Sequence, residues 1–174
     1  SLHEVFHGNC QMFDNFKRNG RLILCRRAID EMRKLPESDW NICAGTLPVY
    51  YLFPNIIFMP TQEGAFLVQE YPIENSPHKS VSKISFYFYP HVLEHVKQLE
   101  KQGVNGKELL QEQYNGFASV IRDEDYVAAA SSHKGLKSGN IDYLTFGKNE
   151  PALHHYHNTY REALGLQSLP LEEA

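Results

Sequence analysis

The sequence has 174 residues, of which 42% are hydrophobic and 12% aromatic, enough for one globular domain with a buried core and too many for a disordered chain. The formal net charge of −4 disfavours a surface that binds nucleic acid or an anionic membrane. No apolar run reaches the roughly 20 residues that a membrane-spanning helix needs.

The first part of the chain gives weak secondary-structure signals. Residues 1–20 show no clean period and predict an irregular lead-in, followed by a short strand over 21–25 and a short helix over 27–35 that ends before Pro36. The cysteines, Cys10, Cys25 and Cys43, are odd in number and show no CxxC spacing. This usage predicts reduced thiols in a cytoplasmic protein.

The centre of the sequence is rich in strand signals. Strands are expected over residues 46–53, 56–59, 65–73 and 81–89, separated by turn signals such as Pro54-Asn55. In the last of these, Ile84, Phe86 and Phe88 alternate with polar or tyrosine side chains. The short links between the strands favour an antiparallel meander, because parallel pairs need long crossovers.

Helices are expected after the strands. The pattern predicts helices over residues 91–102, 107–139 and 151–164, with a short strand over 142–146 between the last two. Gly103, Gly139 and Gly165 are suited to the helix ends, and Pro151 to a first helical turn. Strands first and helices later indicate an α+β fold, with a curved antiparallel sheet wrapped around a long helix.

The helix expected from Lys107 to Gly139 carries an apolar stripe that one acidic residue interrupts. The stripe contains Leu110, Tyr114, Phe117, Ile121 and Ala128. Asp125 falls on the same stripe, where a carboxylate must be paired, hydrogen-bonded or bound to a metal. Either Asp125 is a metal ligand or catalytic carboxylate, or the helix bends at residues 122–125 and Asp125 reaches solvent or an arginine.

The histidines raise the question of a metal site. His154, His155 and His157 lie in the final helix with no carboxylate at the next turn, so packing or surface roles are expected. The pairs His91/His95 and His3/His7 have a spacing that can chelate a metal on a helix. Nothing in the sequence indicates that the helix of His91 and His95 lines a cleft. The residues around His3 and His7 show no helical pattern. Spacing alone therefore names no reaction.

Several motifs in a fixed order carry a family resemblance. They are RRAIDEMRKLPESDW, VYYLFPNIIFM, IRDEDYVAAASSHKGLKSG, FGKNEPALHHYH and REALG. Together they resemble the C-terminal catalytic domain of Rieske non-haem iron oxygenases, the large (alpha) subunits of aromatic-ring-hydroxylating enzymes. The resemblance runs from roughly Phe6 to Gly165. It implies a helix-grip fold of the SRPBCC type, in agreement with the pattern of strands and helices.

The resemblance also implies a metal ligand. In that family two histidines and one carboxylate hold a mononuclear Fe(II) and leave positions open for O₂ and substrate. The carboxylate comes from an acidic pair on the long helix, ahead of a polar residue and a Gly-Leu pair. Here the acidic pair is Glu124-Asp125 and the polar residue is His133, where the family has glutamine. Asp125 is thus the expected metal ligand and catalytic residue, with Glu124 as the second choice.

Two parts of the family's iron machinery have no match in this sequence. The histidine ligands follow a D/E-x-x-H-x4-H pattern, which His3 and His7 do not fit. The C-x-H and C-x-x-H pairs that bind the [2Fe-2S] Rieske cluster are also missing. Residues 1–174 are therefore expected to be one domain, the C-terminal part of a truncated catalytic domain without its Rieske domain. The chain alone is expected to bind no iron and to be inactive.

For the parent protein, the resemblance implies an oxygenase that hydroxylates an aromatic or other organic substrate with O₂. A reductase or ferredoxin would donate the electrons, and the family assembles as trimers. The expected apolar substrate pocket is lined by Phe86, Phe88, Tyr114, Phe117 and Ile121, which do not specify a molecule. The alternative is a stand-alone helix-grip module that binds a small apolar ligand without a metal.

Overall fold

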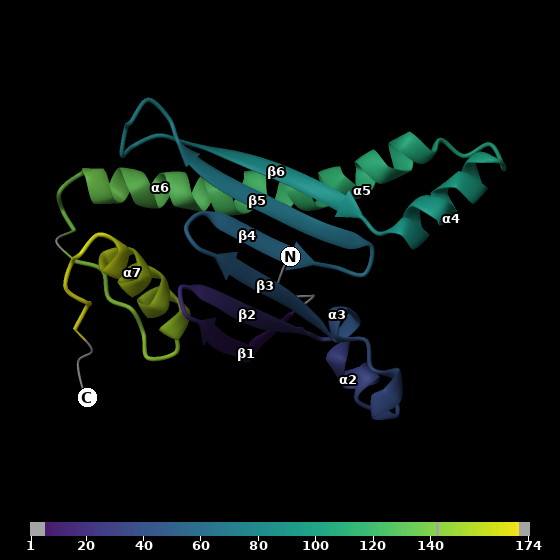
Figure 1. Cartoon of the computed structure of the whole chain (residues 1–174), viewed down its shortest axis with the longest axis horizontal. Coiled ribbons are helices and arrows are strands. Elements are labelled where there is room, and N and C mark those ends of the chain that lie inside the picture. The colour runs from purple at the N-terminus through teal and green to yellow at the C-terminus, as the bar shows by residue number, and fades with distance from the viewer. Residues whose placement is uncertain (1–5, 142, 171–174) are drawn as a thin grey trace. The chain divides into compact units, whose positions relative to one another are not determined.

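The structure is a computed structural model that describes residues 6–141 and 143–170. It divides into two compact units. The sheet unit comprises Ser1–Tyr87 and Phe146–Ala174, and the helical unit comprises Phe88–Thr145. Figure 1 shows the strands of the sheet unit with helix α7 (Pro151–Ala163). It also shows the helices of the helical unit, which are α4 (Pro90–Glu100), α5 (Gly106–Val120) and α6 (Tyr126–Lys137).

The sheet unit is built on one six-stranded sheet in which every strand pairs with its neighbour in sequence (Figure 1). The strands are β1 (Phe6–Phe16), β2 (Asn19–Arg26), β3 (Thr46–Leu52), β4 (Ile56–Pro60), β5 (Gly64–Pro72) and β6 (Ser80–Phe88). The pairings from β1 to β5 are all antiparallel. The predicted α+β class and the antiparallel meander are confirmed.

The prediction of an irregular lead-in is wrong, because strand β1 lies within that part of the chain. Its pairing with β2 shifts register between Phe6 and Gln11. A bulge of this kind puts an extra residue into one strand and breaks the alternation of side chains. The sequence of β1 therefore lacks the period of 2 by which a strand is recognised.

The register places two adjacent rows of residues on opposite faces of the sheet. One row contains Asn15, Gly20, Tyr51, Ile57 and Val68, and the next contains Asp14, Arg21, Tyr50, Phe58 and Leu67. Consecutive side chains of a strand point to opposite faces, so the two rows do as well. Helix α7 (Pro151–Ala163) contacts β1 and β2 on the face of the first row, where the ring of Tyr156 lies 5.0 Å from that of Tyr51.

Three buried side chains of β4 and β5 lie on the same face as α7. Phe66 is 3% exposed, Val68 4% and Met59 7%. The ring of Phe66 lies 4.2 Å from that of Phe86 in β6, so Phe86 packs against this buried side chain. Burial of these side chains removes apolar surface from water and stabilises the sheet.

Short helical elements link β2 to β3. They are α2 (Ile29–Met32), the 3₁₀ turn η1 (Glu37–Asp39) and α3 (Ile42–Gly45). The helix expected over 27–35 is thus shorter than predicted. Asn41 caps α3, because its side chain accepts hydrogen bonds from the backbone N–H groups of Cys43 and Ala44.

The helical unit contains α4 (Pro90–Glu100), α5 (Gly106–Val120), the π-helical segment η2 (Ile121–Asp125) and α6 (Tyr126–Lys137). Asn105 caps the start of α5, because its side chain accepts a hydrogen bond from the backbone N–H of Glu108 at 3.3 Å. Gly139, with a φ of 73°, follows the end of α6. The long helix predicted from Lys107 is therefore present, with an interruption at η2.

The segment before α7 is not the strand that the sequence predicted. Residues 143–146 have no regular structure, and Asp142 lies outside the described residues. Phe146 packs instead against α7, with its ring 5.4 Å from His154 and 5.1 Å from His157.

Among the helices that the structure describes, none has the length and apolar character needed to cross a membrane.

Candidate functional site

The expected metal ligand lies at the end of the π-helical segment. Asp125 is the last residue of η2, and α6 begins at Tyr126. His133 follows in α6 and is half-buried. A π-helix forms i→i+5 hydrogen bonds and holds more residues per turn than an α-helix. The side chains after η2 therefore point in directions that a regular α-helix would not give them.

This change in helical phase explains where the predicted stripe fails. Ile121 is buried, and Tyr114 and Phe117 are half-buried, as the stripe predicts. Asp125 and Ala128 are exposed. The stripe assumed 3.6 residues per turn throughout, and the π-helical turn breaks that period after Ile121.

An ion pair beside Asp125 involves its neighbours in sequence. Arg122 donates from Nε to Oδ1 of Asp123 at 2.7 Å and from Nη2 to Oδ2 at 2.9 Å. These hydrogen bonds lower the pKa of the Asp123 carboxyl and raise the pKa of Arg122. Because Arg122 is engaged by Asp123, it does not neutralise Asp125. The structure therefore presents Asp125 as an exposed carboxylate at the end of a helix irregularity.

The expected pocket residues are divided between the two units. Phe86 belongs to the sheet unit, where it contacts Phe66. Phe88, Tyr114, Phe117 and Ile121 belong to the helical unit. Tyr114, Phe117 and Ile121 are spaced by three and four residues, which places them on one side of the helix that leads to Asp125.

The described histidines take packing or surface positions, as the sequence predicts. His155 lies against the ring of Phe13, and its Nε2 is 2.9 Å from the backbone oxygen of Asn19. His154 and His157 pack on Phe146. In α4, His91 is exposed and stacks on Tyr89 at 5.8 Å, and His95 is exposed.

The donor set for an iron ion is incomplete among the residues that the structure describes. Within residues 6–141 and 143–170, no group of three His, Cys, Asp or Glu side chains could hold a metal ion. The family's iron site uses three protein ligands, and Asp125 is the carboxylate expected among them. His3 lies outside the described residues, and so does the side chain of His7. The described residues alone therefore do not fit a complete iron site.

Sequence reasoning missed a cavity that lies wholly within the sheet unit. It has a volume of about 340 Å³ and lies among β3, β4, β5, the loop before β6, and α7. Its lining includes Tyr51, Tyr71, Tyr156, Tyr160, Glu70 and Lys79. We call it the tyrosine cavity. The sequence signal for it is slight: Tyr156 and Tyr160 are four residues apart and share a face of α7.

Comparison with known proteins places the chain in a family. The family model of the ring hydroxylating alpha subunit (catalytic domain) matches residues 6–166. No curated protein and no solved structure matches the chain. The match covers nearly the whole sequence and confirms the resemblance that the motifs predicted. The chain therefore belongs to the family of ring hydroxylating alpha subunits, in the region of their catalytic domain.

Proposed function

We propose that this chain supplies Asp125 as the carboxylate ligand of a mononuclear non-haem iron, in an oxygenase that hydroxylates an aromatic or other organic substrate. The observation that carries the proposal is the π-helical segment that ends at Asp125. Single π-helical turns inside longer helices occur frequently at functional sites. The family match and the order of the motifs support the same assignment.

The local structure suits Asp125 to this role better than its acidic neighbour Asp123. A ligand carboxylate must have oxygens that are free to approach the metal, and both oxygens of Asp123 accept from Arg122. The side chain of Asp125 is exposed, and its oxygens are not bound by Arg122 in this way. When bound by two histidines and one carboxylate, iron in this family activates O₂. Glu124, also exposed, remains the second choice for the ligand.

The substrate is proposed to lie against the apolar side chains that precede Asp125 on the same helix. Tyr114, Phe117 and Ile121 would supply an apolar wall, and Phe88, which belongs to the same unit, is proposed as a further lining residue. Such a surface favours an organic, ring-containing substrate over a charged one. Electrons would come from a ferredoxin or reductase, and the assembled enzyme would be a homo-oligomer.

Iron analysis of matched variants tests the ligand. The protein is expressed from its complete native gene and purified without oxygen, and iron per chain is measured by mass spectrometry. We expect Asp125→Ala to lose most of the iron and the oxygenase turnover. Asp123→Ala, two residues away in the same segment, should keep both.

Two outcomes would contradict the assignment. Full iron content in Asp125→Ala would show that Asp125 is not the ligand. If Glu124→Ala lost its iron while Asp125→Ala kept it, Glu124 would be the ligand instead. Iron bound tightly and stoichiometrically by residues 1–174 alone would show that all the ligands lie within this sequence, in a pattern that differs from the family's.

A further inference from the structure

One wall of the tyrosine cavity is held in place by contacts inside the protein. The hydroxyls of Tyr51 and Tyr160 both donate to the backbone oxygen of Pro54. The ring of Tyr156 lies 5.0 Å from that of Tyr51 and 5.1 Å from that of Tyr160. The three rings therefore form one packed group, tied to the turn between β3 and β4. A wall that is already in place does not have to be ordered when a ligand binds.

A second wall comes from the loop before β6, which supplies Ser76, Pro77 and Lys79 to the lining. The backbone N–H of Ser76 donates to the oxygen of Ile73 at 2.9 Å. The N–H of Ile73 donates to the oxygen of Lys79 at 3.1 Å and closes the loop at its base. The ammonium group of Lys79 also lies 2.7 Å from a carboxylate oxygen of Glu74. The loop is thus shaped by its own contacts, so both walls are formed before a ligand binds.

Polar side chains around the cavity bind to other groups of the protein. The side chain of Asn55 donates to the backbone oxygen of Glu70 at 2.7 Å, and the Tyr71 hydroxyl accepts from Nε2 of Gln69 at 2.9 Å. The carboxylate of Glu70 accepts from the hydroxyl of Ser82. Such groups could meet the charge of a ligand only by sharing or giving up these contacts. An uncharged ligand leaves them intact.

We propose that the tyrosine cavity binds a small uncharged aromatic molecule through apolar contacts. A volume of about 340 Å³ suits such a ligand. Four tyrosines, three prolines and Ile57 make up most of the lining. An aromatic ring packs favourably on a tyrosine either edge-to-face or offset-stacked, so the preference does not depend on which part of each ring the cavity presents. The proposal does not rest on the iron site, because every lining residue belongs to the sheet unit.

Titration of the full chain with benzyl alcohol tests whether an aromatic molecule binds in this cavity. Isoleucine methyl groups are labelled for NMR, because the ring current of a bound aromatic molecule shifts the signal of a methyl group beside it. Ile57 lines the cavity, so its methyl signals should shift and give the Kd. Ile42 in α3, which is 62% exposed and not part of the lining, should not shift. No shift of Ile57 would overturn the proposal, and a shift of Ile121 alone would place the ligand at the proposed substrate surface instead.

Three ligands of similar shape test why the cavity would prefer benzyl alcohol. Benzylammonium and benzoate carry a positive and a negative charge, and cyclohexylmethanol has no aromatic ring. Their Kd values are measured by competition with benzyl alcohol at the Ile57 signals. We expect each to bind about tenfold more weakly than benzyl alcohol. Equal affinity of a charged ligand would show that charge is tolerated, and equal affinity of cyclohexylmethanol would show that no aromatic ring is required. Each of these results would overturn the proposal.

Variants of two lining residues test the location. Ser80→Trp puts a large side chain into the lining, and Tyr156→Leu removes an aromatic ring from it. Each should weaken the binding of benzyl alcohol by about tenfold. Ser131→Trp and Tyr87→Leu make the same changes at exposed positions outside the lining and should leave the Kd unchanged. Thermal unfolding checks that every variant is folded. A higher Kd in either lining variant alone would support the proposal, and unchanged Kd values in both would overturn it.

Discussion

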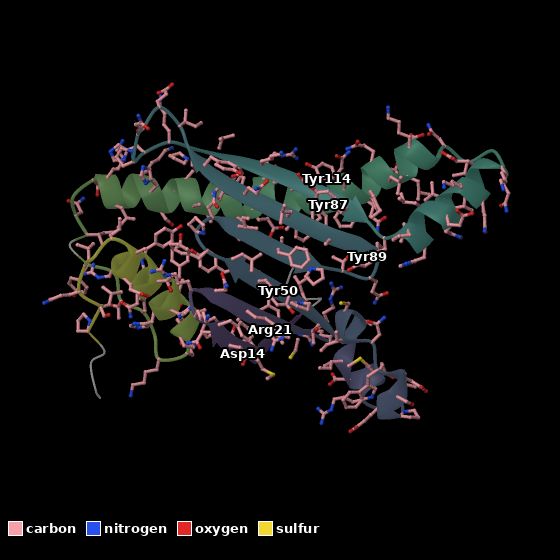
Figure 2. All side chains as sticks on the ribbon, in the orientation of Figure 1. Asp14, Arg21, Tyr50, Tyr87, Tyr89 and Tyr114 are labelled. Atoms are coloured by element: carbon pink, nitrogen blue, oxygen red, sulfur yellow. The ribbon has the colours of Figure 1, made fainter. Side chains whose placement is uncertain are left out.

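Arg21 and Asp14 face each other on β2 and β1, where the guanidinium donates to Oδ2 of Asp14 from Nη2 at 2.6 Å and from Nε at 3.2 Å (Figure 2). The guanidinium carbon also lies 5.4 Å from the ring centre of Phe16 and 5.9 Å from that of Tyr50. The hydrogen bond to Asp14 is the main cause of the raised pKa of Arg21. One planar side chain thus connects three neighbouring strands.

This arrangement predicts that Arg21→Lys destabilises the protein although the charge is kept. Lysine lacks the planar fork that reaches Oδ2 through two nitrogens, and it stacks less well on aromatic rings. The urea midpoint of Arg21→Lys should fall below that of the wild type. Arg33→Lys, the same change at an exposed residue next to α2, should leave the midpoint unchanged. Equal midpoints for the two variants would show that charge alone matters at Arg21.

The contact between Phe66 and Phe86 predicts a large stability effect in the sheet unit. Phe66 is 3% exposed, and its ring lies 4.2 Å from that of Phe86. Phe66→Ala should reduce the free energy of unfolding by about 3–5 kcal/mol, because it removes buried apolar surface and leaves a cavity.

The matched control for Phe66 is Tyr87, which is 61% exposed in β6 (Figure 2). Tyr87→Ala should change the free energy of unfolding by no more than about 0.5 kcal/mol. Both values come from urea denaturation monitored by circular dichroism. A loss below about 1 kcal/mol in Phe66→Ala would mean that Phe66 is not part of the core.

Most of the fold could be predicted because its signals are local. The alternation around Phe86 identified β6, and Pro151 and Gly165 marked the start and end of α7 to within two residues. Two elements escaped prediction for the same physical reason. The register shift in β1 and the π-helical turn at Ile121–Asp125 each disturb the side-chain period on which the prediction depends.

Less of the candidate sites than of the fold could be predicted from the sequence. Asp125 could be singled out from the sequence because a carboxylate on an apolar stripe is unusual. The sequence left two alternatives open for Asp125, and its exposure at the π-helical turn agrees with the one in which the helix is irregular at residues 122–125 and the side chain reaches solvent. The tyrosine cavity was out of reach, since Tyr51, Glu70 and Tyr156 come from β3, β5 and α7 and meet only after the sheet has formed.

The tyrosine cluster predicts how stability depends on alkaline pH. Burial, with smaller effects from Tyr160 and Glu70, raises the pKa of Tyr156 from 10.0 to about 12. Burial, with smaller effects from the neighbouring Tyr160, also raises the pKa of Tyr51. The folded protein therefore holds these protons more tightly than the unfolded chain does. Their contribution to stability is complete below about pH 10 and is lost as the pH rises through about 12.

Tyr156→Phe separates this effect from general alkaline denaturation. Phenylalanine keeps the ring but has no proton to lose, so the decrease in the free energy of unfolding between about pH 9 and pH 11 should be smaller than in the wild type. Tyr156 is partly exposed, so water screens its interactions and the difference should be on the order of 1 kcal/mol. Tyr87→Phe, which removes a hydroxyl from an exposed tyrosine, is the matched control. Urea unfolding at both pH values measures the decrease, and tyrosinate absorbance follows the titration directly. Tyr156→Phe could instead lose as much stability as the wild type over this range. The hydroxyl of Tyr156 would then have the same pKa in the folded and unfolded states, and its position beside Tyr51 and Tyr160 would have no electrostatic consequence.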